Sequence, residues 1–205
     1  MSGKRILLAT RSRGKLAELH PMFEGAGFQV LDLIDVGLPE TPEEDELEVF
    51  ETFEENALAK ARYFHRLTRG MPTVADDSGL EVDALHGAPG VRSKRWARPG
   101  LTGLSLDEAN NSRLLSELRG QVNRRCRYVC VAALVTESRE LVRRGEAEGD
   151  VLEAPRGDGG FGYDPLIFSR DLGRGFAEVA RAEKEIVSHR GRAFRALIQA
   201  LQGSG

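Results

Sequence analysis

The feature that most constrains the fold is an apolar run, a polar loop and an amphipathic segment in that order at the N-terminus. Residues 5–9 (RILLA) have the length and composition of a buried strand. Residues 10–14 (TRSRG) form a polar turn, after which Leu16, Leu19 and Phe23 recur at helical spacing. A strand, a loop of a size to hold phosphate and a helix predict an α/β fold.

The rest of the chain continues this alternation of strands and helices. Further strands are expected at 29–33, 73–75, 80–85, 127–136, 141–152 and 165–168, and the pair at 127–136 and 141–152 suggests a hairpin. A helix is expected at about 51–67. A second should begin at the capping box Ser105–Glu108 and run to about Leu118, and a last helix should begin after Ser188, its cap. Without an internal repeat or a clear boundary, residues 1–205 are expected to form a single domain with mixed strands.

Composition narrows the possible function. The 205 residues are 40% hydrophobic, which is enough for one sizeable core. The net charge of −3 opposes polyanion binding, so no nucleic-acid partner is expected. No apolar run approaches the length of a membrane span, and charge resumes at Arg11 too early for a signal peptide. Cys126 and Cys130 lack the helping ligands of a zinc site, and we expect reduced core thiols in a cytoplasmic protein.

The first candidate site is the basic loop between the first strand and the first helix. Its members are Thr10, Arg11, Ser12, Arg13, Gly14 and Lys15. Backbone N–H groups at a helix N-terminus attract anions, and Lys15 adds a full positive charge. The loop lacks the spacing of a Walker motif. An ordinary polar turn with solvated basic residues is the alternative.

The second candidate site is an acidic pair at the end of a predicted strand. Asp76 and Asp77 precede Ser78 and Gly79, and two adjacent carboxylates repel unless a cation or a proton intervenes. Carboxylate oxygens are ligands that Mg²⁺ prefers, and Glu48, in an acidic loop, is a further candidate. Side chains alternate along a strand, so only one of the pair need face a given site. The alternative is a turn with an Asx cap.

Two further clusters lie in the C-terminal part of the chain. The segment from Gly157 to Asp164 has four glycines in its first six positions, so a flat ligand can lie on it, while Phe161 and Tyr163 can stack on a base. Lys184 and the Ser188–His189–Arg190 run place cations near a predicted helix start, where they oppose the helix dipole. A local cost of this kind suggests function. The alternatives are a hairpin connection and a solvated basic patch.

Taken together, these segments resemble the inosine triphosphate pyrophosphatase family. The matching stretches, from Leu7 to Phe194 and in the family's order, are LLATRSRGKLAEL, TFEENALAKA, VADDSGLEVDALHGAPGVRSKRW, GDGGFGYDPLIF and EKEIVSHRGRAF. The resemblance implies an elongated mixed-sheet α/β fold of two lobes with the active site in the cleft between them. It also implies Mg²⁺, a homodimer, and hydrolysis of ITP, dITP and XTP to the nucleoside monophosphate and pyrophosphate.

The resemblance also implies roles for individual residues. Thr10, Arg11, Ser12, Arg13, Gly14 and Lys15 match the phosphate-binding loop. Glu48 and Asp77 match metal ligands, Asp77 also matches the general base, and Ser78 matches a substrate contact. Phe161, Gly162, Tyr163, Asp164, Lys184, His189 and Arg190 match the nucleotide pocket. The chain departs from the family pattern at Ser12, where Asn is usual, at Phe50, where Gly is usual, and at Lys94, where a small residue is common.

Hydrogen-bond polarity suggests how the base is chosen. His189 and Arg190 can donate to the 6-oxo group of hypoxanthine or xanthine. The 6-amino group of adenine would instead face these donors, and leaving such a group without a hydrogen-bond partner costs about 1–3 kcal/mol. Guanine, which also has a 6-oxo group, is not rejected by this argument. Three other functions remain open from the sequence: a nucleotide-sensing protein without turnover, a nucleic-acid-binding protein, and a hydrolase of pyrimidine triphosphates.

Overall fold

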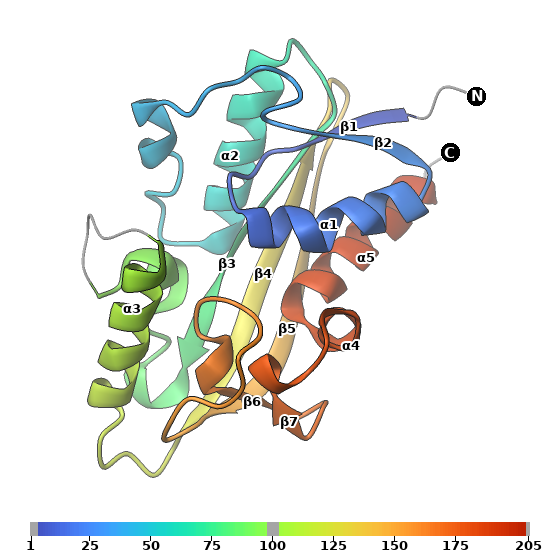
Figure 1. Ribbon diagram of the computed structural model, residues 1–205. Coiled ribbons are helices and arrows are strands. Elements are labelled where there is room, and N and C mark those ends of the chain that lie inside the picture. The colour runs from blue at the N-terminus through green and yellow to red at the C-terminus, as the bar shows by residue number, and fades with distance from the viewer. Residues whose placement is uncertain (1–3, 98–102, 204–205) are drawn as a thin grey trace. The chain divides into compact units, whose positions relative to one another are not determined.

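The sheet draws its strands from the whole length of the chain. The computed structural model describes residues 4–97 and 103–203. The strands are β1 (Lys4–Leu8), β2 (Phe28–Asp32), β3 (Thr73–Val82), β4 (Arg125–Val135), β5 (Glu140–Val151), β6 (Ile167–Ser169) and β7 (Arg174–Gly175). Over the described residues they form one sheet in the order β2-β1-β3-β4-β5-β6-β7 (Figure 1). β1 runs parallel to β2 and β3, whereas β6 is antiparallel to β5 and β7. The mixed sheet confirms the predicted α/β class.

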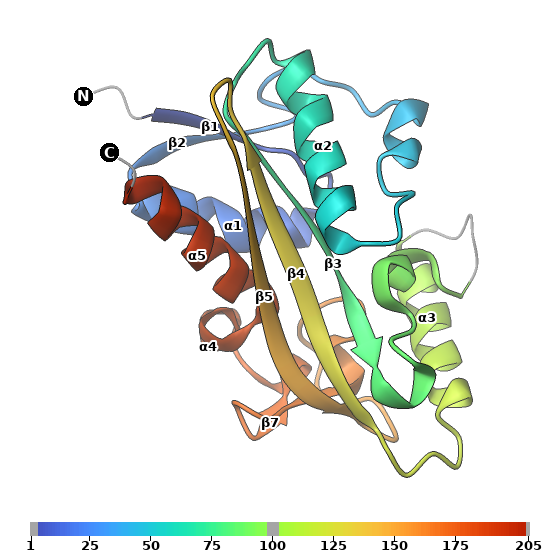
Figure 2. The ribbon, with the colours of Figure 1, turned by 180° about the vertical axis from the view of Figure 1, so that it is seen from behind.

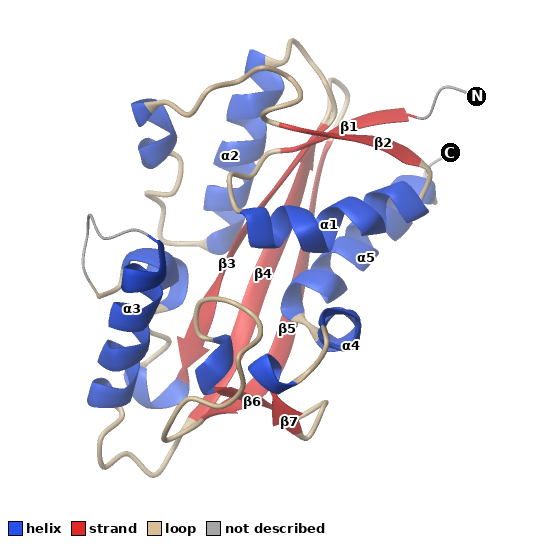
Figure 3. Ribbon diagram, viewed as in Figure 1, coloured by secondary structure: helices blue, strands red, loops and turns tan. Residues whose placement is uncertain are grey.

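One helix follows each of β1, β2 and β3, and two more follow β7 near the end of the chain (Figure 3). They are α1 (Arg13–Gly25), α2 (Phe53–Leu67), α3 (Gly103–Glu117), α4 (Arg181–Val187) and α5 (His189–Gln202). Short 3₁₀ turns include Pro42–Glu46 in the acidic loop and Asp164–Leu166 before β6. The α1, α2 and α5 helices confirm the periodicities seen in the sequence. The chain's described helices include none long and apolar enough to cross a bilayer.

Two compact units make up the chain, and each has its own core. Unit 1 comprises Met1–Asp77, Cys130–Gly145 and Arg190–Gly205, and unit 2 comprises Ser78–Val129 and Glu146–His189. β3, β4 and β5 each contribute residues to both units.

The core of unit 1 lies between its strands and the pair α1 and α5. α1 and α5 lie side by side on one face of the strands, and α2 covers the opposite face (Figures 1 and 2). Alternation along β1 sends Ile6 and Leu8 into the core under α1 and α5. Phe23 of α1 and Phe194 of α5 meet there edge to face, with ring centroids 5.9 Å apart. This packing holds α1 and α5 together against the strands of unit 1.

The core of unit 2 joins β4, β5, β6 and α3. It contains Leu114 from α3 and Leu118 just after that helix, together with Phe176 and Ile167, and all four are almost completely buried. Cys126 belongs to this core and Cys130 to that of unit 1, and both are free thiols as predicted.

Three boundaries predicted from the sequence are wrong. β3 runs without a break from Thr73 to Val82, so Asp76–Gly79 lies inside a strand rather than in a loop (Figure 3). The polar side chains of this run have partners from other elements, since Asp76 pairs with Lys15 and Asp77 accepts a hydrogen bond from Asn56. α3 begins at Gly103, so Ser105 lies within the helix and is not its cap. β6 begins at Ile167 because Asp164–Leu166 closes a 3₁₀ turn.

Candidate active site

The basic loop enters α1 through side-chain caps. Ser12 is the N-cap residue, and its hydroxyl accepts a hydrogen bond from the backbone N–H of Lys15 at 3.4 Å. Thr10 supports the turn, since its hydroxyl accepts from the backbone N–H of Ser12 at 3.2 Å. Arg13 is exposed on the first turn, and Gly14 follows it. The replacement of the usual Asn by Ser12 therefore retains a cap for this helix.

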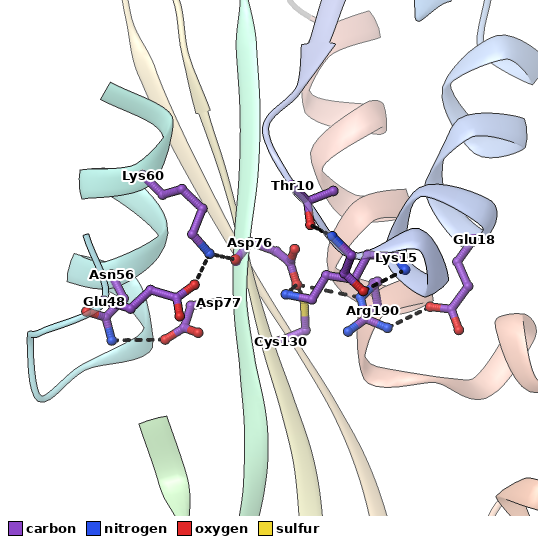
Figure 4. A network of polar contacts seen from close by, with 11 residues as sticks. Thr10, Lys15, Glu18, Glu48, Asn56, Lys60, Asp76, Asp77, Cys130 and Arg190 are labelled. Atoms are coloured by element: carbon purple, nitrogen blue, oxygen red, sulfur yellow. Dashed lines mark hydrogen bonds and ion pairs between the residues drawn. The ribbon is translucent and has the colours of Figure 1, made fainter. Parts of the chain in front are cut away.

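Lys15 and Asp76 form the centre of a buried ion network on the α1 and α5 face of β3 (Figure 4). The Nζ of Lys15 lies 2.9 Å from the Oδ2 of Asp76, whose side chain is 1% exposed. The Nε of Arg190 lies 3.5 Å from the same oxygen, and its Nη1 lies 2.6 Å from the Oε2 of Glu18. The thiol of Cys130 approaches Asp76 at 3.7 Å. Asp76 is thus the carboxylate around which the start of α1 and the start of α5 are held.

The charge state of Asp76 follows from these partners. Burial by itself raises the pKa of a carboxyl, because it penalises the charged form. Here the attraction of Lys15, Arg190 and Lys60 outweighs burial and holds the pKa of Asp76 well below its usual range. Asp76 is therefore an ionised structural residue at every physiological pH.

Asp77 points to the other face of β3, toward α2 (Figure 4). Its Oδ2 accepts a hydrogen bond from the Nδ2 of Asn56 at 3.0 Å. Burial and the negative charge of Glu48 raise the pKa of Asp77 to about 6. The two adjacent acids thus diverge, as the alternation of a strand requires, and they experience opposite electrostatic environments.

Glu48 lies beside Asp77 and is paired with Lys60 of α2. The Nζ of Lys60 contacts the Oε1 of Glu48 and also donates to the backbone carbonyl of Asp76 at 2.9 Å. Phe50 lies two residues after Glu48 and is hydrogen-bonded to Asn56. The Oδ1 of Asn56 accepts from the backbone N–H of Phe50 at 2.9 Å, and its Nδ2 donates to the Phe50 carbonyl at 3.2 Å. Asn56 and Lys60 therefore fix the end of the acidic loop close to Asp77.

The donor set around Asp77 suits a magnesium ion that is also bound by a substrate. Across the described residues there is no cluster of three or more His, Cys, Asp or Glu side chains able to hold a metal alone. Glu48 is nevertheless close enough to Asp77 for its negative charge to raise the pKa of Asp77. Mg²⁺ is commonly bound through one or two carboxylates, with phosphate oxygens and water completing its shell. Two repelling carboxylates fit that pattern.

Unit 2 contains a second buried network, with Asp164 at its centre. Its Oδ2 accepts from the Nζ of Lys184 at 2.6 Å and from the backbone N–H of Phe161 at 2.9 Å. Its Oδ1 accepts from the hydroxyl of Tyr128 at 3.2 Å. The ring of Tyr128 stacks on that of His189, with centroids 4.6 Å apart. Asp164, Lys184 and His189 are therefore brought together, as the sequence predicted.

The glycine-rich loop of unit 2 is held by both its backbone and its neighbours. A Cβ added at Gly160 would lie 2.2 Å from the Oδ2 of Asp164, and the φ of +74° also favours glycine there. Phe161 is 39% exposed, and the Nζ of Lys184 lies 4.9 Å from the centre of its ring. Tyr163 is buried instead, and its hydroxyl donates to the carbonyl of Ser93 at 2.9 Å. Phe161 thus offers an accessible aromatic face, whereas Tyr163 serves the core.

Helix α3 fastens this loop at Gly162. Asp107 accepts from the backbone N–H of Gly162 at 2.9 Å, and Asn111 donates to its carbonyl at 3.0 Å. The two side chains are four residues apart and so lie on the same face of α3.

The remaining predicted residues take less central positions. Ser78 lies within β3 and is half-buried. Arg190 is 3% exposed and belongs to the network of unit 1, whereas His189 belongs to that of unit 2. Arg11 points to the acidic loop, where it contacts Glu44.

Sequence reasoning gave no role to several residues of these networks. They are Glu18, Asn56, Lys60, Asp107, Asn111 and Tyr128. Asn56 and Lys60 stand in the TFEENALAKA segment, where Asn56, a polar residue on the buried face of the helix, was a usable signal. Asp107 and Asn111 gave no such signal, because acidic and amide residues are ordinary on an exposed helix face.

Comparison with known proteins gives the same relatives by sequence and by fold. The model of the Ham1 family matches residues 6–200. A dITP/XTP pyrophosphatase of Ralstonia nicotianae is 44% identical over 97% of each chain, and one of Mycobacterium tuberculosis is 48% identical over 97% of this chain and 95% of its own. The solved structure of a HAM1 protein from Coxiella burnetii superposes with a TM-score of 0.84 at 34% identity, covering 97% of this chain and 98% of that one.

Proposed function

The chain belongs to the Ham1 family, and on that premise we propose that it hydrolyses non-standard purine nucleoside triphosphates such as dITP, XTP and ITP. The products are the nucleoside monophosphate and pyrophosphate. The observation that carries this proposal is the arrangement about β3: a basic helix start is joined to Asp76, and Asp77 and Glu48 lie on the opposite face of the same strand.

The basic loop supplies the groups that hold phosphates. The N-terminal N–H groups of α1 and the side chain of Lys15 are directed to the same end of the helix, where anions bind. Lys15 is partly exposed and pairs with the buried Asp76, so its position is fixed before a nucleotide arrives. Preorganised charge of this kind stabilises a leaving pyrophosphate without further rearrangement.

Asp77 is the residue we assign as the general base. A water molecule gives up a proton to the Asp77 carboxylate and attacks the α-phosphorus, while the bond to the bridging oxygen breaks and pyrophosphate departs. Asn56 holds the Oδ2 of Asp77 at 3.0 Å, which fixes the direction of the carboxylate. Asp76 does not share this role, because three cations hold it.

Magnesium fits Glu48 and Asp77. When bound there it supplies positive charge that neutralises the triphosphate. Lys60 already neutralises Glu48 in part, and it keeps the Glu48 carboxylate beside Asp77.

The network of unit 2 provides the groups that recognise the base. Phe161 offers a face for stacking, and Asp164, Lys184 and His189 offer hydrogen-bond partners of both polarities. We further propose that the enzyme is a cytoplasmic homodimer without nucleic-acid or membrane partners, which light scattering of the purified protein would test for the oligomeric state.

A substrate panel tests the proposed function. Purified protein is incubated with Mg²⁺ and ITP, dITP, XTP, GTP, ATP or dTTP, and the products are resolved by chromatography. We expect kcat/KM for the first three to exceed that for ATP and dTTP, with monophosphate as the nucleotide product. Comparable turnover of dTTP would favour a pyrimidine triphosphate hydrolase instead, and binding without turnover would indicate a nucleotide sensor.

A further inference from the structure

Arg11 is a member of the basic loop whose guanidinium is already occupied within unit 1. Its Nε and Nη2 contact the two carboxylate oxygens of Glu44 at 3.1 and 2.6 Å, which is a bidentate pair. Its Nη1 donates to the carbonyl of Leu38 at 2.8 Å, and Nη2 also donates to the carbonyl of Pro39 at 2.8 Å. All three guanidinium nitrogens are thus directed at the acidic loop.

The acidic loop, residues 38–50, is the segment that carries Glu48. Its end is fixed to α2 by Asn56 and Lys60, as described above. Its beginning has Arg11 as the link to the basic loop. Because Arg11 follows Thr10 directly and precedes the Ser12 cap of α1, the acidic loop is attached to the residues that begin α1.

From these contacts we propose that Arg11 is a positioning residue, which holds the Glu48-bearing acidic loop to the phosphate-binding loop and does not itself contact the triphosphate. A lysine would not replace it, since a single ammonium group cannot span a carboxylate and two carbonyls in a fixed plane. The assignment separates Arg11 from Lys15, whose partly exposed ammonium group contacts Asp76 and makes no contact with the acidic loop. Its consequence for turnover rests on the proposed function, whereas its structural part does not.

The structural part is tested by amide hydrogen exchange of the nucleotide-free protein. The reporters are the N–H groups of Leu47 and Phe50, which donate to Glu44 and Asn56 respectively. We expect Arg11→Ala and Glu44→Ala each to accelerate exchange in residues 38–50 by about tenfold, the change that corresponds to about 1.4 kcal/mol. The matched control is Arg62→Ala, which removes another bidentate Arg–Glu pair of unit 1, that with Glu140, and should leave this exchange unchanged.

The catalytic part is tested by steady-state kinetics with dITP. A positioning role predicts that Arg11→Ala lowers kcat by about 10- to 100-fold with little change in KM, since small misplacements of a reacting group have such effects. Glu44→Ala should lower kcat in the same way. The kcat of the double variant should lie within about twofold of that of Arg11→Ala, because both changes remove the same Arg11–Glu44 contact. Arg11→Lys should recover only part of the loss, and Arg62→Ala should retain normal kinetics.

The results that would overturn the proposal differ from those that would overturn the proposed function. If Arg11→Ala raises KM while exchange in residues 38–50 stays normal and Glu44→Ala is active, Arg11 binds the triphosphate and is not a positioning residue. If the wild-type protein does not hydrolyse dITP at all, the proposed function fails. Accelerated exchange in Arg11→Ala and Glu44→Ala would still support the structural assignment in that case, and unchanged exchange would refute it.

Discussion

At the scale of single residues, Asp76 and Asp77 are neighbours in β3 with opposite electrostatic environments. Lys15 and Arg190 surround the carboxylate of Asp76, so its charge is stabilised by burial with partners. Asp77 has an amide as hydrogen-bond donor and Glu48 as a repelling neighbour, so its charge is costly in the folded protein. A buried carboxylate whose charge is costly to the fold suggests a group that serves chemistry rather than stability.

Asp77→Asn should therefore separate activity from stability. The change removes the proposed base while nearly keeping its shape, and kcat should fall by a factor on the order of 10²–10⁴. The melting temperature at pH 7 without metal should equal or exceed that of the wild type, since a repelled buried charge is lost. Near-normal turnover of this variant would show that Asp77 is not the base.

The pH dependence of that difference has a definite sign. The pKa of Asp77 is about 6 in the folded protein against an ordinary value of 3.8, so folding binds a proton between these pH values. The wild type therefore loses stability as pH rises through this window. The advantage of Asp77→Asn in metal-free buffer should be full above pH 6 and should vanish below about pH 3.8, as thermal melting across pH would show.

Asp76→Asn should have the opposite effect on stability. The change leaves Lys15 and Arg190 without their shared carboxylate, and removing one partner of a buried ion pair costs about 3–5 kcal/mol. The control is Asp150→Asn, which breaks an exposed pair with Arg170 and should cost at most about 1 kcal/mol. Chemical denaturation measures both, and equal losses for the two variants would contradict the structural role of Asp76.

At the scale of elements, α1 and β1 could be predicted from sequence, whereas the full length of β3 could not. An apolar run followed by helical periodicity is a local signal, and both elements appear where it stands. The stretch Asp76–Gly79 looks locally like a turn, because Lys15 and Asn56, the partners of its two carboxylates, are distant in sequence. The same reason explains why Arg11 seemed a phosphate ligand: its partners, from Leu38 to Glu44, are set by tertiary contacts.

Helix α3 should control the glycine-rich loop through its two contacts with Gly162. Asp107→Ala or Asn111→Ala removes one contact, and the loop carrying Phe161 should become more mobile. We expect KM for dITP to rise about fivefold, the change that corresponds to the net contribution of about 1 kcal/mol from one hydrogen bond, while kcat changes less. Glu117→Ala, in an exposed pair with Arg113 on the same helix, is the control. An unchanged KM in both α3 variants would show that the clamp does not affect nucleotide binding.

At the scale of the whole molecule, the proposed roles divide between the two units. Unit 1 contains the phosphate-binding and acidic residues, and unit 2 contains the aromatic loop with Asp164 and Lys184. The motifs of both were visible in the sequence because their residue types are unusual for loops and helix starts. That Arg190 is one of the partners of Asp76 was not visible in the sequence, since it approaches from α5, more than a hundred residues along the chain.

The position of the attacked phosphorus tests the account most directly. Purified protein is incubated with dITP and Mg²⁺ in water enriched in ¹⁸O, and the ¹⁸O content of each product is determined by mass spectrometry. Attack at the α-phosphorus predicts one ¹⁸O atom in the nucleoside monophosphate and unlabelled pyrophosphate. Label in pyrophosphate, or stepwise release of labelled orthophosphate through a diphosphate, would contradict it.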